Sequence, residues 1–141
     1  MKRTALRIVV VCVSSLAASA SGAIRSWTGA GGDNEWNNEQ NWSGNALPSY
    51  ADTVRFTNDV PLSVRVHSIS PLGKIWRFEG KDVTFGSDQG RRVTMYFSNS
   101  PTCEVFVAEG TTVVSSNTIS MYNKAPLIKT GKGCFKLVGR R

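Results

Sequence analysis

Apolar and polar residues alternate along the chain from Thr53 onward, in short runs separated by turn-forming residues. In one run, Leu62 and Val64 alternate with Ser63 and Arg65. The further runs are Val54-Arg55-Phe56, Trp76-Arg77-Phe78, Val83-Thr84-Phe85, Val93 to Phe97, Val105 to Val107, Ile119 to Met121 and Phe135-Lys136-Leu137. Alternation with a period of two residues, built from β-branched and aromatic side chains, predicts strands that each bury one face.

Glycine, proline, asparagine and aspartate cluster between these runs and predict turns, for example at Ser70–Gly73. After the first residues, no long segment shows the helical period of about 3.6 residues. The sequence therefore predicts an all-β fold. Two architectures bury many short strands of this kind, an antiparallel β-sandwich and a β-solenoid, and the spacing of the runs does not separate them.

Residues 1–23 have the layout of a secretory signal peptide. Basic residues precede an apolar run from Ile8 to Ala17, and small residues follow it. The small residues offer two cleavage points, after Ala20 and after Ala23. The apolar run is shorter than the roughly 20 residues of a membrane-spanning helix. We therefore expect the mature chain to be exported and to lack a transmembrane segment.

Charge is distributed unevenly along the chain. Lysine and arginine number 17 against 10 acidic residues, and no acidic residue follows Glu109. Such a basic end would suit an anionic polymer. Because no aromatic residues interleave with these charges in the pattern of a nucleic-acid-binding surface, the sequence favours a solvated strand face. We expect no specific nucleic-acid partner.

The segment 24–52 differs from the alternating runs because it is rich in glycine and asparagine. It holds Trp27, Trp36 and Trp42, while the chain has 4 tryptophans in all. The first edge of a strand stack is open and needs a cap, which buried aromatic rings would provide. The alternative is that these rings are exposed and form a platform for sugars. Asp52 is expected to hydrogen-bond backbone groups where the cap meets the first strand.

The segment up to Phe56 also has a distinctive order of tryptophan, glycine and polar residues. Its marker residues are Trp27, Gly29, Gly31, Gly32, Asp33, Trp36, Asn41, Trp42, Asp52 and Phe56. This order resembles the N-terminal region of secreted bacterial proteins that carry autotransporter-associated β-strand repeats. The resemblance implies a right-handed parallel β-helix that is exported and then displayed at the cell surface or released. It implies no catalytic residues.

Residues 127–139 carry a second resemblance. They combine an apolar start, Lys-x-Gly-x-Gly, two alternating apolar residues and a final glycine, through Lys129, Gly131, Gly133, Phe135, Leu137 and Gly139. This pattern resembles the repeat itself. Cys134 and Lys136 depart from it, because such repeats usually carry a small polar residue there. A single end turn would expose its edge and its apolar core, so we expect an open C-terminal face.

These features divide the chain into a signal peptide at 1–23, a cap at 24–52 and solenoid turns at 53–141, which end in one repeat at 127–139. The predicted function is that of a non-catalytic β-helix module, secreted or displayed at the outer surface of a bacterium. It would be the N-terminal fragment of an autotransporter-like or adhesin-like protein, with a cell-surface or matrix polysaccharide as partner. The alternative is a carbohydrate-binding module that uses exposed tryptophans.

Few residues suggest a disulfide, a metal site or a catalytic site. Cys103 and Cys134 are expected either as a disulfide or as two buried thiols. The oxygen-bearing residues from Asp33 to Glu39 lack the order of a calcium-binding EF-hand, and turn hydrogen bonds explain them better. His67 has no partner placed for catalysis, and the sequence shows no cluster of carboxylates of the kind a polysaccharide lyase needs. We therefore expect no catalytic site, no metal and no cofactor.

Overall fold

The computed structural model of the protein describes residues 22–66, 72–87, 95–97, 103–115, 119–120 and 126–138. These residues form short strands and a 3₁₀ helix, η1 (Glu39–Asn41). The strands are β1 (Ile24–Ser26), β2 (Thr53–Phe56), β3 (Leu62–Arg65), β4 (Leu72–Gly73), β5 (Ile75–Phe78), β6 (Val83–Gly86), β7 (Met95–Phe97), β8 (Cys103–Val107), β9 (Thr112–Ser115), β10 (Ile119–Ser120), β11 (Leu127–Thr130) and β12 (Cys134–Leu137). In this part of the chain, no helix has the length and apolar character needed to cross a membrane.

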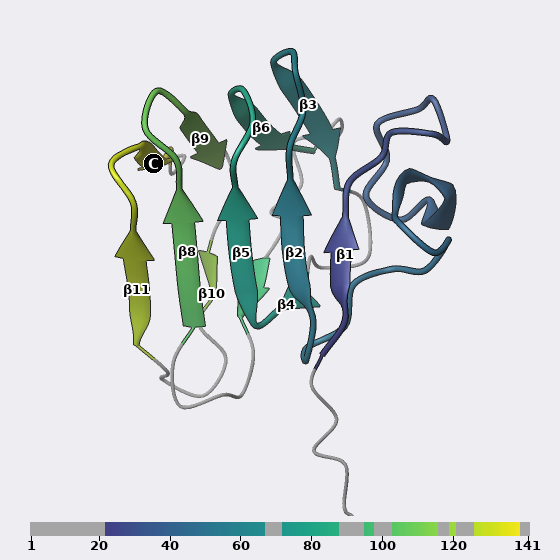
Figure 1. Ribbon diagram of the computed structural model, residues 1–141, viewed down its shortest axis with the longest axis horizontal. Coiled ribbons are helices and arrows are strands. Elements are labelled where there is room, and N and C mark those ends of the chain that lie inside the picture. Colours follow the sequence, from purple (N-terminus) through teal and green to yellow (C-terminus); the bar gives the residue numbers. More distant parts are fainter. Residues whose placement is uncertain are drawn as a thin grey trace, which may run out of the picture.

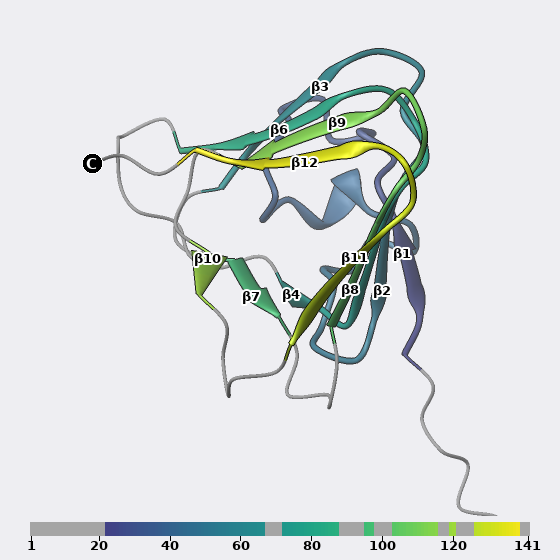
Figure 2. The ribbon, with the colours of Figure 1, turned by 90° about the vertical axis from the view of Figure 1, so that its left-hand side faces the viewer.

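The strands form three sheets, and from β2 onward every third strand joins the same sheet. The five-stranded sheet has the order β1-β2-β5-β8-β11, the four-stranded sheet β12-β9-β6-β3, and the three-stranded sheet β10-β7-β4. All ladders between these strands are parallel. The all-β prediction is confirmed, and the alternative of an antiparallel sandwich is wrong. Figure 1 shows the five-stranded sheet face on, and Figure 2 shows the four-stranded sheet meeting it at a corner.

The alternating runs become strands because each can bury one face. On β5, Trp76 and Phe78 are buried, whereas Ile75 and Arg77, which alternate with them, are partly exposed. The same alternation is present on β2, β3, β6, β8 and β9. The period of two residues predicts these strands well because it depends only on neighbours along the chain.

The core is built by stacking equivalent positions of successive strands. Phe56, Phe78 and Val107 lie in register on β2, β5 and β8, and all three are buried. The rings of Phe56 and Phe78 stack with centroids 5.2 Å apart. Phe85, from the four-stranded sheet, packs edge-on against both rings. Burying each such side chain contributes about 1.5–3 kcal/mol.

Two very short strands, β1 and β4, lie where the sequence predicts a cap and a turn. β1 falls within the predicted cap and pairs with β2, so the cap segment begins as a strand of the five-stranded sheet. β4 falls within the predicted turn Ser70–Gly73 and pairs with β7. With only two or three residues each, these strands carry too little alternation to be recognised from the sequence.

Candidate functional site

The three tryptophans of the cap are buried. Trp36 and Trp42 each expose 1% of their surface, and Trp27 exposes 9%. Their rings contact one another edge to face, with centroids 5.0 Å apart for Trp27 and Trp42 and 4.6 Å apart for Trp36 and Trp42. The prediction that these three rings are buried is confirmed. The exposed sugar platform is wrong for these rings, because no ring face is open to a ligand.

The cap rings continue the aromatic stack of the core. Trp36 stacks on Trp76 of β5 with centroids 5.5 Å apart, and Trp27 stacks on Phe56 of β2 at 5.9 Å. The indole N–H of Trp42 donates a 2.9 Å hydrogen bond to the carbonyl oxygen of Trp36. This hydrogen bond satisfies the indole N–H of Trp42 although the ring is buried.

A polar network on Asp33 holds the turn that carries these rings. The carboxylate of Asp33 accepts hydrogen bonds from the N–H of Glu35 at 3.0 Å and from the side-chain amides of Asn38 at 2.8 Å and Asn41 at 2.7 Å. These three hydrogen bonds hold the pKa of Asp33 below its ordinary value, with the bond from Glu35 having the largest effect and that from Asn41 the smallest of the three. Asn41 is fully buried, and its Oδ1 accepts from the N–H of Gly31 at 2.8 Å.

This network gives the marker residues of the cap a structural role. Asp33, Asn41 and Gly31 meet in it, while Gly29 and Gly32 lie in the same turn with φ of 66° and 73°. The oxygens of Asp33 are engaged by N–H donors and so are not arranged for a cation. The described residues contain no group of acidic, histidine or cysteine side chains that could hold a metal ion.

The cap also covers the first edges of two sheets. At β1, the N–H of Ser43 donates to the carbonyl oxygen of Ser26 at 2.9 Å, and the N–H of Ser26 donates to Ser43 Oγ at 3.0 Å. At β3, the N–H of Trp36 donates to the carbonyl oxygen of Arg65, and the N–H of Arg65 donates to that of Asn34. At Ser26 and Arg65, the backbone groups that a further strand would use are thereby occupied. Figure 1 shows the cap beside β1.

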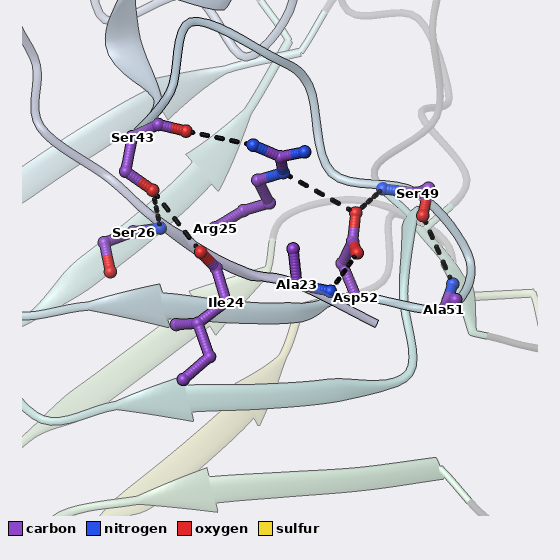
Figure 3. A network of polar contacts seen from close by, with 8 residues as sticks. All are labelled: Ala23, Ile24, Arg25, Ser26, Ser43, Ser49, Ala51 and Asp52. Carbon is purple, nitrogen blue, oxygen red and sulfur yellow. Dashed lines mark hydrogen bonds and ion pairs between the residues drawn. The ribbon is translucent and has the colours of Figure 1, made fainter. Parts of the chain in front are cut away.

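Asp52 joins the cap to the first strands. Its carboxylate is buried, with 6% of the residue exposed, and it accepts from the N–H of Ala23 at 2.7 Å and from that of Ser49 at 2.8 Å. The guanidinium Nε of Arg25 lies 3.8 Å from Asp52 Oδ2. Figure 3 shows these groups converging on the carboxylate. The prediction that Asp52 hydrogen-bonds backbone groups at this junction is confirmed.

The outer face of the five-stranded sheet carries an arginine pair that the sequence analysis missed. Arg55 and Arg77 lie in register, and each binds Glu79, at 2.6 Å and 2.7 Å. Partial burial acts to raise the pKa of Glu79, but the bonds and charges of Arg77 and Arg55 outweigh it and hold the pKa below its ordinary value. Arg77 also lies 4.6 Å from the ring centre of Phe106. The repeated apolar-Arg-apolar pattern was the signal that could have revealed this pair.

The repeat-like segment forms the last edges of two sheets. Gly131 has φ of 74°, and a Cβ there would lie 2.2 Å from the carbonyl oxygen of Val107, so only glycine fits. A Cβ on Gly133 would lie 2.1 Å from the carbonyl oxygen of Ala108. Phe135 is partly buried, whereas Leu137 exposes 55% of its surface. The predicted open face is present at this edge of the described strands, and Gly139 lies outside the described residues.

The two cysteines are not bonded to each other in the structure. Cys103 is buried at the start of β8, and its Sγ donates to the carbonyl oxygen of Lys74 at 3.2 Å. Cys134 is exposed at the start of β12, in the four-stranded sheet. They lie on different sheets, one buried and the other exposed, and the structure holds no disulfide between them. The alternative of two buried thiols is wrong for Cys134.

His67 lies outside the described residues. Comparisons with protein-family models, curated proteins and solved structures found no match to the chain. A proposal about function therefore depends on the cap, the parallel sheets and the exposed faces described above.

Proposed function

We propose that the chain is a right-handed parallel β-helix that forms the N-terminal module of a secreted or surface-displayed bacterial protein, similar to autotransporter-like and adhesin-like proteins. Its role would be to present a rigid face to a partner and not to catalyse a reaction. The observation that carries this proposal is the order of strands in the three parallel sheets.

In a solenoid, each turn adds one strand to each sheet and contacts only the neighbouring turns. The groups β2-β3-β4, β5-β6-β7 and β8-β9-β10 each contribute one strand to each sheet, and β11 and β12 begin the next group. Equivalent strands of successive groups are parallel neighbours. This arrangement supports a solenoid.

The two ends support an N-terminal position for the module. The cap bonds the backbone of Ser26 on β1 and of Arg65 on β3, which hinders growth of the stack beyond the cap. The edges of β11 and β12 have a strand neighbour on one side only among the described strands. Further turns of a longer solenoid would add at this second edge and cover Leu137.

Export is the part of the proposal that an expression experiment tests directly. Residues 1–141 with a C-terminal epitope tag are produced in a bacterial host, and the protein is measured in the cytoplasm, the envelope and the medium. Deleting residues 2–20 provides the control. Export of the full chain and retention of the deleted chain support the proposal, whereas equal retention of both in the cytoplasm contradicts it.

A polysaccharide is the partner that the outer face suggests. Arg55, Arg77 and Phe106 lie in register on adjacent strands and are partly or largely exposed, which places hydrogen-bond donors beside an aromatic ring. Such groups can bind sugar hydroxyls and carboxylates. Binding of soluble acidic and neutral polysaccharides to the exported protein is measured by calorimetry. Arg77→Ala should weaken binding about tenfold, corresponding to a lost hydrogen bond to a charged group, whereas Lys132→Ala, in the turn between β11 and β12, should not.

A carbohydrate-binding module that uses the tryptophans is not favoured by any observation, because the three rings are buried.

A further inference from the structure

We infer that the signal peptide is removed between Ala20 and Ser21, so that the mature chain begins at Ser21 and keeps Gly22 and Ala23, which are part of the fold. The inference rests on the proposed function, because it requires that the chain is exported. The sequence offers a second cleavage point after Ala23 that fits the small-residue pattern equally well. The structure distinguishes the two.

Ala23 is held by both of its backbone groups. Its N–H donates a 2.7 Å hydrogen bond to Oδ1 of the buried Asp52, and its carbonyl oxygen accepts a 2.8 Å hydrogen bond from the N–H of Thr53. The second bond continues the ladder between β1 and β2 by one residue. Figure 3 shows the N–H of Ala23 directed at the carboxylate. Ala23 therefore behaves as a residue of the folded domain.

Gly22 is fitted to the fold as well. A Cβ built at this position would lie 1.6 Å from the carbonyl oxygen of Ala51 and 2.8 Å from the backbone nitrogen of Asp52. These neighbours are backbone atoms, which cannot move aside as a flexible side chain would. The absence of a side chain at residue 22 is thus a requirement of packing in the mature protein and not solely a preference of the peptidase.

Cleavage after Ala23 would remove these contacts. Asp52 would lose the N–H of Ala23, and the N–H of Thr53 would lose its acceptor. The carboxylate would keep the N–H of Ser49 and the guanidinium of Arg25 at 3.8 Å. Leaving a buried polar group without its partner costs its desolvation. The shorter chain would therefore be less stable than the chain that begins at Ser21.

The proposed step is hydrolysis of one peptide bond by a signal peptidase. Water adds across the bond between Ala20 and Ser21, which leaves a carboxylate on Ala20 and an α-ammonium on Ser21. Ala18 and Ala20 are the small residues that precede the bond, in the Ala-x-Ala form such enzymes accept. No other reactant is required.

N-terminal sequencing and intact mass of the exported protein test the inference. The expected N-terminal sequence is Ser-Gly-Ala-Ile. A chain that begins at Ile24 overturns the inference while leaving the proposed export intact. An exported chain that keeps Met1 also overturns the inference alone. Retention of the chain in the cytoplasm with Met1 in place overturns the proposed export as well, so the two failures are distinguishable.

A substitution at residue 22 gives an independent readout. If Gly22 belongs to the mature chain, exported Gly22→Ala protein should melt at a lower temperature than the wild type. If cleavage follows Ala23, residue 22 is lost with the signal, and the two exported proteins should be identical in mass and in Tm. Gly44→Ala serves as a control that lies in the mature chain under either cleavage.

The role of Asp52 is tested in chains whose first residue is fixed by design. Residues 21–141 and 24–141 are released from a fusion partner, with and without Asp52→Asn. An asparagine cannot accept at both oxygen positions, so the substitution should lower the Tm of the longer chain more than that of the shorter one. An equal effect in both chains overturns the coupling of Ala23 to Asp52. If residues 24–141 fail to fold while 21–141 fold, the requirement for residues 21–23 is shown directly.

Discussion

Each end of the strand stack leaves a sheet edge and the end of a buried row of side chains, and the two ends differ in how these are covered. One row of equivalent positions runs through Arg25, Val54, Trp76, Val105 and Lys129 on successive strands. The three middle residues are buried, and a cation occupies each end. The row therefore has buried apolar side chains at its centre and a charged side chain at each edge of the sheet.

The difference lies in what surrounds the two cations. Arg25 sits beneath the cap, where Asp52 and the carbonyl oxygen of Ser43 face its guanidinium. Lys129 is exposed, and its Nζ donates to the carbonyl oxygen of Gly131 in its own turn. An inward-placed charge is one way to discourage strand pairing at an edge. The capped end is closed by packing and hydrogen bonds, whereas the other end has no cap among the described residues and carries an exposed cation in its core-facing row.

The largest effect is expected from removing a ring of the cap. Trp36→Ala should lower the free energy of unfolding by about 3–5 kcal/mol, because it empties a buried site between Trp42 and Trp76. Phe135→Ala, at the partly exposed opposite end, should cost roughly half as much. Chemical denaturation followed by circular dichroism measures both. Equal costs at the two ends would contradict the comparison, and Tyr50→Ala, an exposed position, should change little.

The polar network of the cap should have the next largest effect. Asn41→Ala removes the acceptor of the Gly31 N–H and the donor to Asp33 and to the carbonyl oxygen of Glu35. Buried groups left without partners cost about 1–3 kcal/mol, and the same denaturation experiment measures the loss. Gln40→Ala is the matched control because its side chain is exposed. A loss no larger than that of the control would show that the rings alone close this end.

Much of the middle of the fold can be predicted from the sequence, because strand alternation is local. Trp76, Phe78, Val83 and Phe85 are predicted on strands from their nearest neighbours, and all are buried. Parallel pairing cannot be predicted this way, since a period of two residues is the same in parallel and antiparallel strands. The packing of Trp36 on Trp76 likewise depends on the register of segments far apart in the chain.

In the candidate site, too, local features can be predicted from the sequence and long-range contacts cannot. Burial of the cap tryptophans and the backbone contacts of Asp52 follow from composition and from the position of the segment. The bond from Ala23 to Asp52, 29 residues apart, and the shared binding of Glu79 by Arg55 and Arg77 do not. These contacts depend on which strands become neighbours, and that is decided by the whole stack and not by any one segment.

Whether Lys129 discourages pairing of this edge with another molecule is tested by measuring self-association. Lys129→Ile would continue the buried row with an apolar residue at the open edge, and it should raise the apparent mass about twofold or more at high protein concentration. Sedimentation velocity measures the shift relative to the wild type. Lys136→Ile adds the same apolar side chain to the outward-facing row of β12 and should associate less. Equal association of the two variants would show that apolar content, and not the core-facing position, controls the edge.

The smallest effect is expected at Glu79, which belongs to neither end. Glu79→Gln should cost about 0–1 kcal/mol, because solvent screens the exposed arginines that bind it. Since folding lowers the pKa of Glu79, its contribution is complete above the ordinary value of 4.5 and is lost as the pH falls through the folded-state pKa. Denaturation of the wild type and Glu79→Gln between neutral pH and pH 3 should therefore show two curves that converge in acid. A gap that widens in acid would contradict the lowered pKa, and a cost as large as that of Trp36→Ala would place the stability of the stack in its middle and not at its capped end.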